Sequence, residues 1–203
     1  MTIATNSIAR NAFRKASDIL QCSDEMCSLI ESNQRSIEVE IPVRRKDGNI
    51  KVYRGFRVQH SNARGPFKGG LRYHPDVDHD HFSELAFIMS CKSALMNIPF
   101  GGAKGGIRCS PEDLDSNELE TLTKRFTEKF VPVLGPDFDI PAPDLGTGPQ
   151  EMSWIFEAYS LIGIINTIPE AGHCPVSRTA IHSRPEICQN LWEILHFSST
   201  FYP

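Results

Sequence analysis

The 203-residue sequence contains no long apolar run, no excess of basic charge and no repeated segment. Without an apolar run of about 18–20 residues, a membrane-spanning helix is excluded. Lysine and arginine number 21 against 25 acidic residues, which gives a net charge of −4 and argues against a general nucleic-acid binder. At 40% hydrophobic residues, a chain of this length can bury a core. These values predict an ordinary globular protein of one or two domains.

Cysteine is also sparse, and its spacing excludes two kinds of scaffold. The six cysteines include no Cys-x-x-Cys pair, so neither a zinc finger nor a disulfide framework is expected. This usage is typical of reduced thiols in the cytoplasm. Residues 1–17 carry three basic and no acidic side chains, which a mitochondrial presequence can also show. We favour a first helix there, and hence a cytoplasmic protein, with the mitochondrial matrix as the alternative.

The hydrophobic pattern predicts alternating helices and strands. Helical spacing extends over residues 7–32, with a break near Ser23, and strands are expected at 37–43 and 52–58, joined by the turn at Asp47-Gly48. Further helices are expected at residues 80–97, from Asp115 with a capping box to Glu118, and from about residue 149 behind a Thr147-x-x-Gln150 cap. Residues 60–79 resemble a loop, and 135–143 a proline-rich strand. Interleaved strands and helices predict a layered α/β domain.

A lysine on one predicted helix has an unusual position. Leu85, Met89, Lys92 and Met96 are spaced by 4, 3 and 4 residues, which places Lys92 on an apolar stripe. Such a lysine either extends its ammonium group to solvent near the helix end or points inward to bind an anion. The spacing alone leaves both interpretations open.

Two more lysines lie among glycines. Lys104 is surrounded by four glycines in the segment 101–106, and Lys68 precedes Gly69-Gly70. Glycine permits close approach of backbone or ligand, although a tight turn with a solvated lysine is the simpler interpretation of each segment. If Lys68, Lys92 and Lys104 converge, mutual repulsion and burial lower their pKa values. A lysine that is neutral near pH 7 can act as a general base or activate water.

One carboxylate complements these lysines. Asp144 follows the proline-stiffened segment 141–143 and precedes a predicted helix, so it serves either as a helix cap or as a proton shuttle that orients an amine. The His- and Asp-rich run at residues 74–81 has no spacing of a defined metal motif, and we predict no metal site there.

Several ordered motifs carry a family resemblance over residues 7–165. They are GFRVQH at 55–60, ARGPFKGGLRYHP at 63–75, MSCK at 89–92, PFGGAKGG at 99–106, GP at 135–136 and DIPAPD at 139–144. With them the chain resembles the amino-terminal, substrate-binding and oligomerising domain of the glutamate dehydrogenases, within the Glu/Leu/Phe/Val dehydrogenase group. The resemblance implies an α/β/α layered domain with a mixed sheet, and an oxidoreductase that forms homo-oligomers, hexamers when complete.

The resemblance also implies a role for each candidate residue. Lys68 would bind the side-chain carboxylate of the substrate, and Lys92 its α-carboxylate. Lys104 would be the catalytic lysine that activates water, and Asp144 would move protons to and from the amino nitrogen. Gly70 and Met89 would line the pocket. The implied reaction converts L-glutamate to 2-oxoglutarate and ammonia, with NAD or NADP as the hydride acceptor.

The carboxy-terminal part departs from the family pattern. No GxGxxG fingerprint of a Rossmann domain is present, and the family's junction motif survives only partly at residues 173–184. We therefore expect a helical segment at 1–35, a substrate-binding and oligomerising domain at 36–165, and a degraded junction at 166–203, with truncation before the Rossmann domain and no cofactor site. The alternative function is an inactive truncated paralogue, acting as an assembly or regulatory subunit, or a partial gene product.

Overall fold

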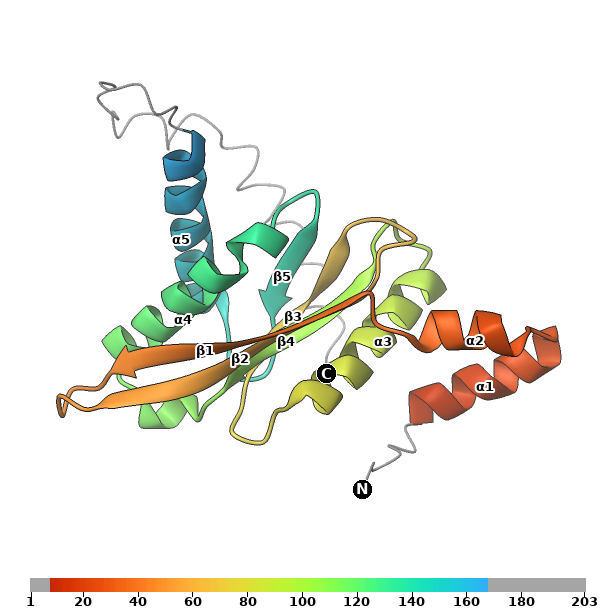
Figure 1. Cartoon of the computed structure of the whole chain (residues 1–203), viewed down its shortest axis with the longest axis horizontal. Coiled ribbons are helices and arrows are strands. Elements are labelled where there is room, and N and C mark those ends of the chain that lie inside the picture. Colours follow the sequence, from red (N-terminus) through yellow and green to blue (C-terminus); the bar gives the residue numbers. More distant parts are fainter. Residues whose placement is uncertain (1–7, 168–203) are drawn as a thin grey trace.

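The computed structural model describes residues 8–167, which form a five-stranded sheet with helices on both faces (Figure 1). The helices are α1 (Ile8–Leu20), α2 (Asp24–Glu31), α3 (His79–Leu95), α4 (Ser116–Phe130) and α5 (Pro149–Thr167), with short 3₁₀ turns at Pro111–Asp113 and Val131–Val133. The strands are β1 (Arg35–Arg44), β2 (Ile50–Ser61), β3 (Phe67–Tyr73), β4 (Gly102–Arg108) and β5 (Asp139–Pro143). None of these helices is long and apolar enough to cross a membrane.

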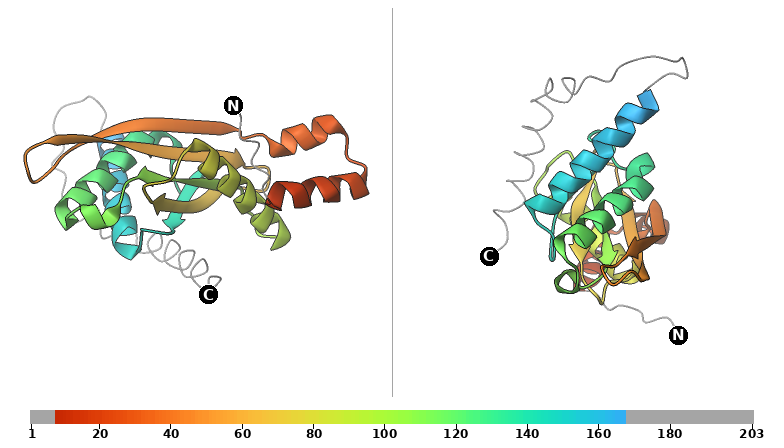
Figure 2. Two further views of the ribbon diagram at one scale, coloured as in Figure 1. Left: turned by 90° about the horizontal axis from the view of Figure 1, so that it is seen from below. Right: turned by 90° about the vertical axis from the view of Figure 1, so that its left-hand side faces the viewer.

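The sheet is mixed, as expected. Its strand order is β1-β2-β4-β3-β5, in which β1, β2 and β4 pair antiparallel while β3 runs parallel to both β4 and β5. The helices α4 and α5 cover one face, and α3 covers the other (Figure 2). The predicted α/β/α layering is therefore confirmed.

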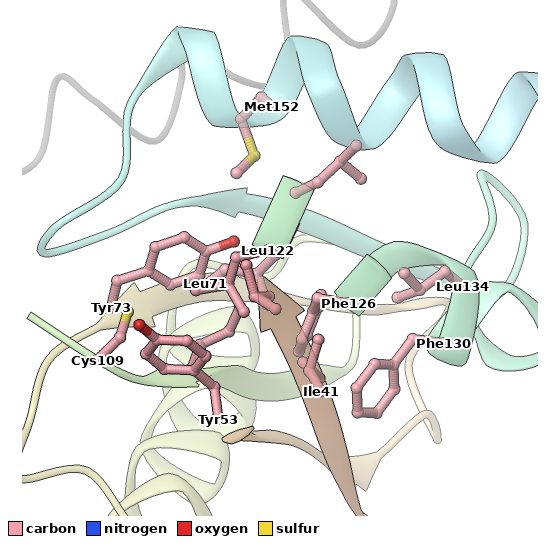
Figure 3. Close-up of a cluster of buried hydrophobic side chains, with 13 residues drawn as sticks. Ile41, Tyr53, Leu71, Tyr73, Cys109, Leu122, Phe126, Phe130, Leu134 and Met152 are labelled. Atoms are coloured by element: carbon pink, nitrogen blue, oxygen red, sulfur yellow. The ribbon is translucent and has the colours of Figure 1, made fainter. Parts of the chain in front are cut away.

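Two apolar clusters hold the layers together. The larger lies between the sheet and α4 and α5, where Leu71, Tyr73, Phe126 and Phe130 are almost completely buried (Figure 3). The smaller joins β2 to α3. Because side chains alternate along a strand, residues of β3 next to Leu71 point to the opposite face, toward α3.

The helical hairpin of α1 and α2 packs on the outer side of α3. Arg10 pairs with Glu84 at 2.9 Å, and the ring of Phe13 meets that of Phe87 edge-on at 5.7 Å. The break expected near Ser23 is present, because the Ser23 side chain accepts a hydrogen bond from the backbone N–H of Met26 and so caps α2. The capping box at the start of α4 is also present.

The glycine-rich segments differ from their predicted form. We expected a loop at 60–79 and a turn around Lys104, whereas the structure places residues 67–73 in β3 and residues 102–108 in β4, adjacent strands inside the sheet. A Cβ on Gly69 would lie 1.6 Å from the Ala103 carbonyl oxygen, and one on Gly106 would lie 1.8 Å from that of Arg72. The glycines therefore permit the close approach of neighbouring backbones rather than a turn.

Some sequence-based expectations fall outside the described residues. These are the presequence-like character of the first seven residues and the degraded junction and tail from 168 onward. Within the described part of α5, the apolar side chains divide between buried and exposed positions. Trp154 is buried, since it lies on the side of the helix that carries buried Met152 and Ile155, while Phe156 and Leu161 are exposed.

Candidate functional site

The candidate residues from β3 and β4 lie on the face of the sheet that α3 covers. Lys68 and Gly70 alternate with Leu71, whose side chain belongs to the cluster on the opposite face. Lys104 on the neighbouring strand reaches the same position, because a Cβ on Gly70 would lie 3.1 Å from its Nζ atom. The two glycine-flanked lysine segments therefore meet by strand pairing.

Lys104 and Asp144 form the centre of the site. The Nζ atom of Lys104 lies 3.1 Å from Oδ1 of Asp144, and both side chains are about nine-tenths buried or more. Burial lowers the pKa of the Lys104 amine, and the positive charge of Arg72 adds to this effect, against the opposing effect of Asp144. The outcome is a lysine with a lowered pKa beside a carboxylate, an arrangement suited to proton transfer.

Asp144 is held by the loop that follows β5. Its backbone N–H donates to the Thr147 hydroxyl at 2.9 Å, and that hydroxyl lies 2.7 Å from the Leu71 carbonyl oxygen of β3. This corrects the expected Thr147-x-x-Gln150 cap. Thr147 ties the Asp144 loop to the sheet, and Glu151 accepts the backbone N–H of Gly148 at the start of α5 instead.

Arg72 also contacts the carboxylate of Asp144, and it was not among the residues predicted from the sequence. Its Nε donates to Oδ2 of Asp144 at 2.7 Å, and its Nη1 lies 3.0 Å from Nε2 of His81 at the start of α3. Burial alone would raise the pKa of the Asp144 carboxyl, but the hydrogen bond from Arg72 and the charge of Lys104 outweigh it, so this pKa is lowered. Recognition of 67–73 as a strand would have placed Arg72 on the face of Lys68 and Gly70.

Lys68 lies two residues before Gly70 on the same strand face. Burial, with a smaller contribution from the charge of Arg57, lowers the pKa of Lys68 to about 8. Such a shift is typical of a buried ammonium group whose charge the protein does not fully neutralise, and an anionic ligand would neutralise it.

Gly70 leaves the space in which Lys104 and Asp144 meet. A Cβ at this position would lie 2.7 Å from the Cβ of Asp144 and 3.1 Å from the Lys104 Nζ atom. Any other residue would push the carboxylate away from the amine. The expected position of Gly70 on the wall of a substrate pocket stays a prediction.

Met89 and Lys92 lie on α3, and their surroundings differ from the predicted apolar stripe. The buried residues of α3 are Phe82, Ala86, Phe87 and Ser93, whereas Met89 is half-buried and Lys92 is exposed. The helix therefore turns a different face to the sheet than the spacing of Leu85, Met89, Lys92 and Met96 suggested. The contacts of the site join Lys104, Asp144, Gly70 and Arg72, while the roles of Met89 and Lys92 stay predictions.

A buried polar network supports the sheet on its other face. The guanidinium group of Arg57 pairs with Asp139 through Nε at 2.9 Å and through a second contact at Nη2, and its Nη1 donates to the Gly69 carbonyl. Gln59 donates to the same carboxylate at 2.7 Å. Since Arg57 and Asp139 are completely buried, this network fixes β2, β3 and β5 relative to one another.

The chemistry of the site does not extend to a metal or a nucleotide within residues 8–167. No group of three His, Cys, Asp or Glu side chains in this range could hold a metal ion. The glycines of β3 and β4 pair with neighbouring strands and form no loop at a helix N-terminus, where a pyrophosphate would bind. A pyrophosphate-binding glycine loop is therefore not present within residues 8–167, and no step of cofactor chemistry is derived from them.

The chain is similar to known proteins of one family. Residues 33–161 match the model of the Glu/Leu/Phe/Val dehydrogenase dimerisation domain. An NAD-specific glutamate dehydrogenase A of Halobacterium salinarum is 46% identical over 153 residues, covering 75% of this chain and 35% of that protein. A glutamate dehydrogenase of Thermotoga maritima is 40% identical over 191 residues, covering 91% and 46%.

Solved structures agree with the sequence matches. The glutamate dehydrogenase of Peptoniphilus asaccharolyticus superposes with a TM-score of 0.74 at 40% identity, covering 76% of this chain and 39% of that chain. The leucine-bound hetero-hexameric glutamate dehydrogenase of Thermus thermophilus gives 0.71 at 36% identity, covering 76% and 38%. The chain thus spans less than half the length of these relatives. Because the family model matches more than half of its residues, this chain belongs to the Glu/Leu/Phe/Val dehydrogenase family.

Proposed function

We propose that this chain provides the substrate half of a glutamate dehydrogenase site, at which L-glutamate is converted to 2-oxoglutarate and ammonia. The observation that carries the proposal is the buried pair of Lys104 and Asp144, held 3.1 Å apart on a sheet face that also bears Lys68. A dicarboxylate needs two cationic contacts, and an amino group that becomes a carbonyl needs proton transfer and activated water. The family's lysines and aspartate supply both.

Each residue then has a distinct part in this proposal. Lys104 activates the water that attacks the carbon of the iminium form of the substrate, and Asp144 moves protons to and from the nitrogen. Lys68 binds the side-chain carboxylate and Lys92 the α-carboxylate, while Gly70 and Met89 line the pocket. The lowered pKa of Lys104 supports its part as a base, because an amine must lose its proton before it can accept one from water.

The overall reaction also needs a hydride acceptor, which we propose to be NAD or NADP. One of the relatives is named as NAD-specific. The residues described here act on the substrate and its protons, and the choice between the two nucleotides does not depend on any of them.

The role of Lys68 can be tested by ligand binding. We expect 2-oxoglutarate to bind weakly at pH 7, and the Lys68→Ala variant to bind about tenfold to a hundredfold more weakly, since a charge-assisted contact contributes about 1.5–3 kcal/mol. Wild-type affinity should also fall as the pH rises through about 8, where Lys68 loses its proton and its attraction for the carboxylate. Isothermal titration calorimetry measures both effects.

The matched control for this test is Lys129→Ala, because Lys129 is exposed on α4 on the far side of the sheet. It should bind 2-oxoglutarate as wild type does. Equal affinity of wild type and Lys68→Ala, with no change in affinity between pH 7 and 9, would contradict the assignment of Lys68.

A second candidate function is that of an assembly or regulatory subunit without its own turnover. It is favoured by the exposed apolar side chains of the α1–α2 hairpin, among them Ile19 and Leu29, and by the hetero-hexameric assembly named for a solved relative. Exposed apolar side chains that gather on one pair of helices are typical of an interface. Under either function we propose that the chain associates with copies of itself or its relatives.

We expect this chain to form oligomers at micromolar concentration, and the Ile19→Glu variant to shift the distribution toward monomer, because a charge on the α1–α2 hairpin is costly to bury. Sedimentation velocity measures the distribution. Ile50→Glu is the matched control, since Ile50 is also exposed but begins β2, and the β1–β2 turn lies at the opposite end of the molecule from the α1–α2 hairpin (Figure 1). A single 22.7 kDa species for wild type would refute self-association.

A further inference from the structure

Arg72 holds a position in the site that no catalytic role explains. Its guanidinium group lies on the same carboxylate as Lys104, with Arg72 Nε on Oδ2 and Lys104 Nζ on Oδ1 of Asp144. The three side chains come from β3, β4 and the loop after β5, so the carboxylate bridges two strands that are parallel neighbours. We propose that Arg72 is a positioning residue, which holds Asp144 in place and shares its charge so that the Lys104 amine can lose its proton.

The two cations that contact Asp144, Arg72 and Lys104, differ in how readily they lose a proton. Arginine stays protonated at all relevant pH values, whereas a buried lysine exchanges its proton readily. In a site with one carboxylate and two cations, the carboxylate neutralises the permanent charge of Arg72 first. Lys104 is then the only member of the trio that can change its charge when substrate or water demands it.

Two of the guanidinium nitrogens of Arg72 contact protein groups. Its Nε is engaged by Asp144 and its Nη1 by His81 at 3.0 Å. Since arginine can only donate, the Nε2 atom of His81 accepts, and the ring proton of a neutral His81 lies on Nδ1. Burial, followed by the charge of Arg72, lowers the pKa of His81, which keeps this acceptor available.

The charged groups around Lys104 come from every element packed against it. They are Asp144 beyond β5, Arg72 on β3, Arg57 on β2 and His81 on α3. Arg57 is neutralised by Asp139 in its own buried pair, and His81 is neutral. Arg72 is thus the cation whose removal changes the field at Lys104 most directly.

This inference rests on the proposed function of Lys104 but can be measured without substrate or nucleotide. With lysine labelled by ¹³C at Cε, the resonance of Lys104 reports its protonation, and Lys104→Arg assigns the signal. In Arg72→Gln we expect Lys104 to titrate at higher pH, so that its neutral fraction at a fixed pH below the midpoint falls about tenfold. Arg72→Lys, which keeps the charge, should restore most of the wild-type curve.

Asp144→Asn should move the Lys104 titration in the opposite direction from Arg72→Gln, because it removes the anion that retains the proton. The matched control is Arg54→Gln, which removes an exposed arginine from β2 and should leave the Lys104 curve unchanged. A folded Arg72→Gln protein with the wild-type Lys104 curve would overturn the proposal.

A measurement on wild type decides the question if Arg72→Gln does not fold. Because Arg72 and Lys104 share one carboxylate, the ¹⁵Nε resonance of Arg72 should follow the Lys104 titration with the same midpoint. An Arg72 resonance without an inflection at that pH would overturn the proposal. Failure of 2-oxoglutarate to bind would count against the proposed function and leave both of these titrations intact.

Discussion

Replacing Asp139 with alanine is expected to lower the free energy of unfolding by about 3–5 kcal/mol, because the change leaves a buried guanidinium group without its partner. Arg57 and Asp139 are both fully buried, and the same carboxylate accepts a hydrogen bond from Gln59. A domain is stable by only about 5–15 kcal/mol. The variant should therefore unfold at a much lower urea concentration, followed by circular dichroism.

Asp137→Ala is the matched control for this prediction. Asp137 is exposed in the turn just before β5, two residues earlier in the chain, so its loss should change stability by less than about 0.5 kcal/mol. A second comparison separates the loss of the attraction between Arg57 and Asp139 from the cost of leaving the Arg57 charge buried and unpaired. The double variant Arg57→Met and Asp139→Leu should recover part of the stability lost in Asp139→Ala. Equal unfolding curves for Asp137→Ala and Asp139→Ala would contradict the prediction.

The second large effect is expected for Gly69→Ala, which should lower the free energy of unfolding by about 3 kcal/mol or more. The added Cβ would lie 1.6 Å from the Ala103 carbonyl oxygen and 2.5 Å from its carbonyl carbon. These are backbone atoms of the adjacent strand β4, so no side-chain rotation can relieve the overlap. Relief requires β3 and β4 to separate, which breaks the centre of the sheet.

Gly148→Ala provides the control, because the nearest atom to its added Cβ would be Oε2 of Glu151 at 3.6 Å, an ordinary contact. Its unfolding midpoint in urea should stay close to that of wild type. If Gly69→Ala unfolds at the same midpoint as Gly148→Ala, then β3 and β4 do not approach as closely as described.

The periodic parts of the fold could be predicted from the sequence. Alternation at residues 37–43 and the Asp47-Gly48 turn indicated the β1–β2 hairpin, and helical spacing with a capping box indicated α4. These elements can be predicted locally, because the backbone geometry of a strand or helix sets the period at which its side chains are buried. Strand β3 and strand β4 were missed, since their glycines suit a turn when considered alone.

The candidate site was predicted residue by residue but not as an arrangement. Lys68, Lys104, Gly70 and Asp144 were each identified and the family resemblance assigned them to one site, but the sequence did not show which of their atoms meet. Arg72 and the supporting pair of Arg57 and Asp139 were not identified, because nothing local distinguishes a buried arginine from an exposed one. The spacing left open which way Lys92 points, and in the structure it is exposed, because the neighbouring α1–α2 hairpin and the sheet together decide which side of α3 is buried.

The sequence by itself determined the family, the layered α/β class and the residues able to carry proton transfer, because motifs and hydrophobic periodicity are local patterns of residues. Only the tertiary structure decided which of these residues meet. Lys104 and Asp144 are 40 positions apart in the sequence, and their 3.1 Å contact depends on parallel pairing of β3 with both β4 and β5. Such pairing joins distant segments through backbone hydrogen bonds, which every residue except proline can both donate and accept, so the residue type does not predict it.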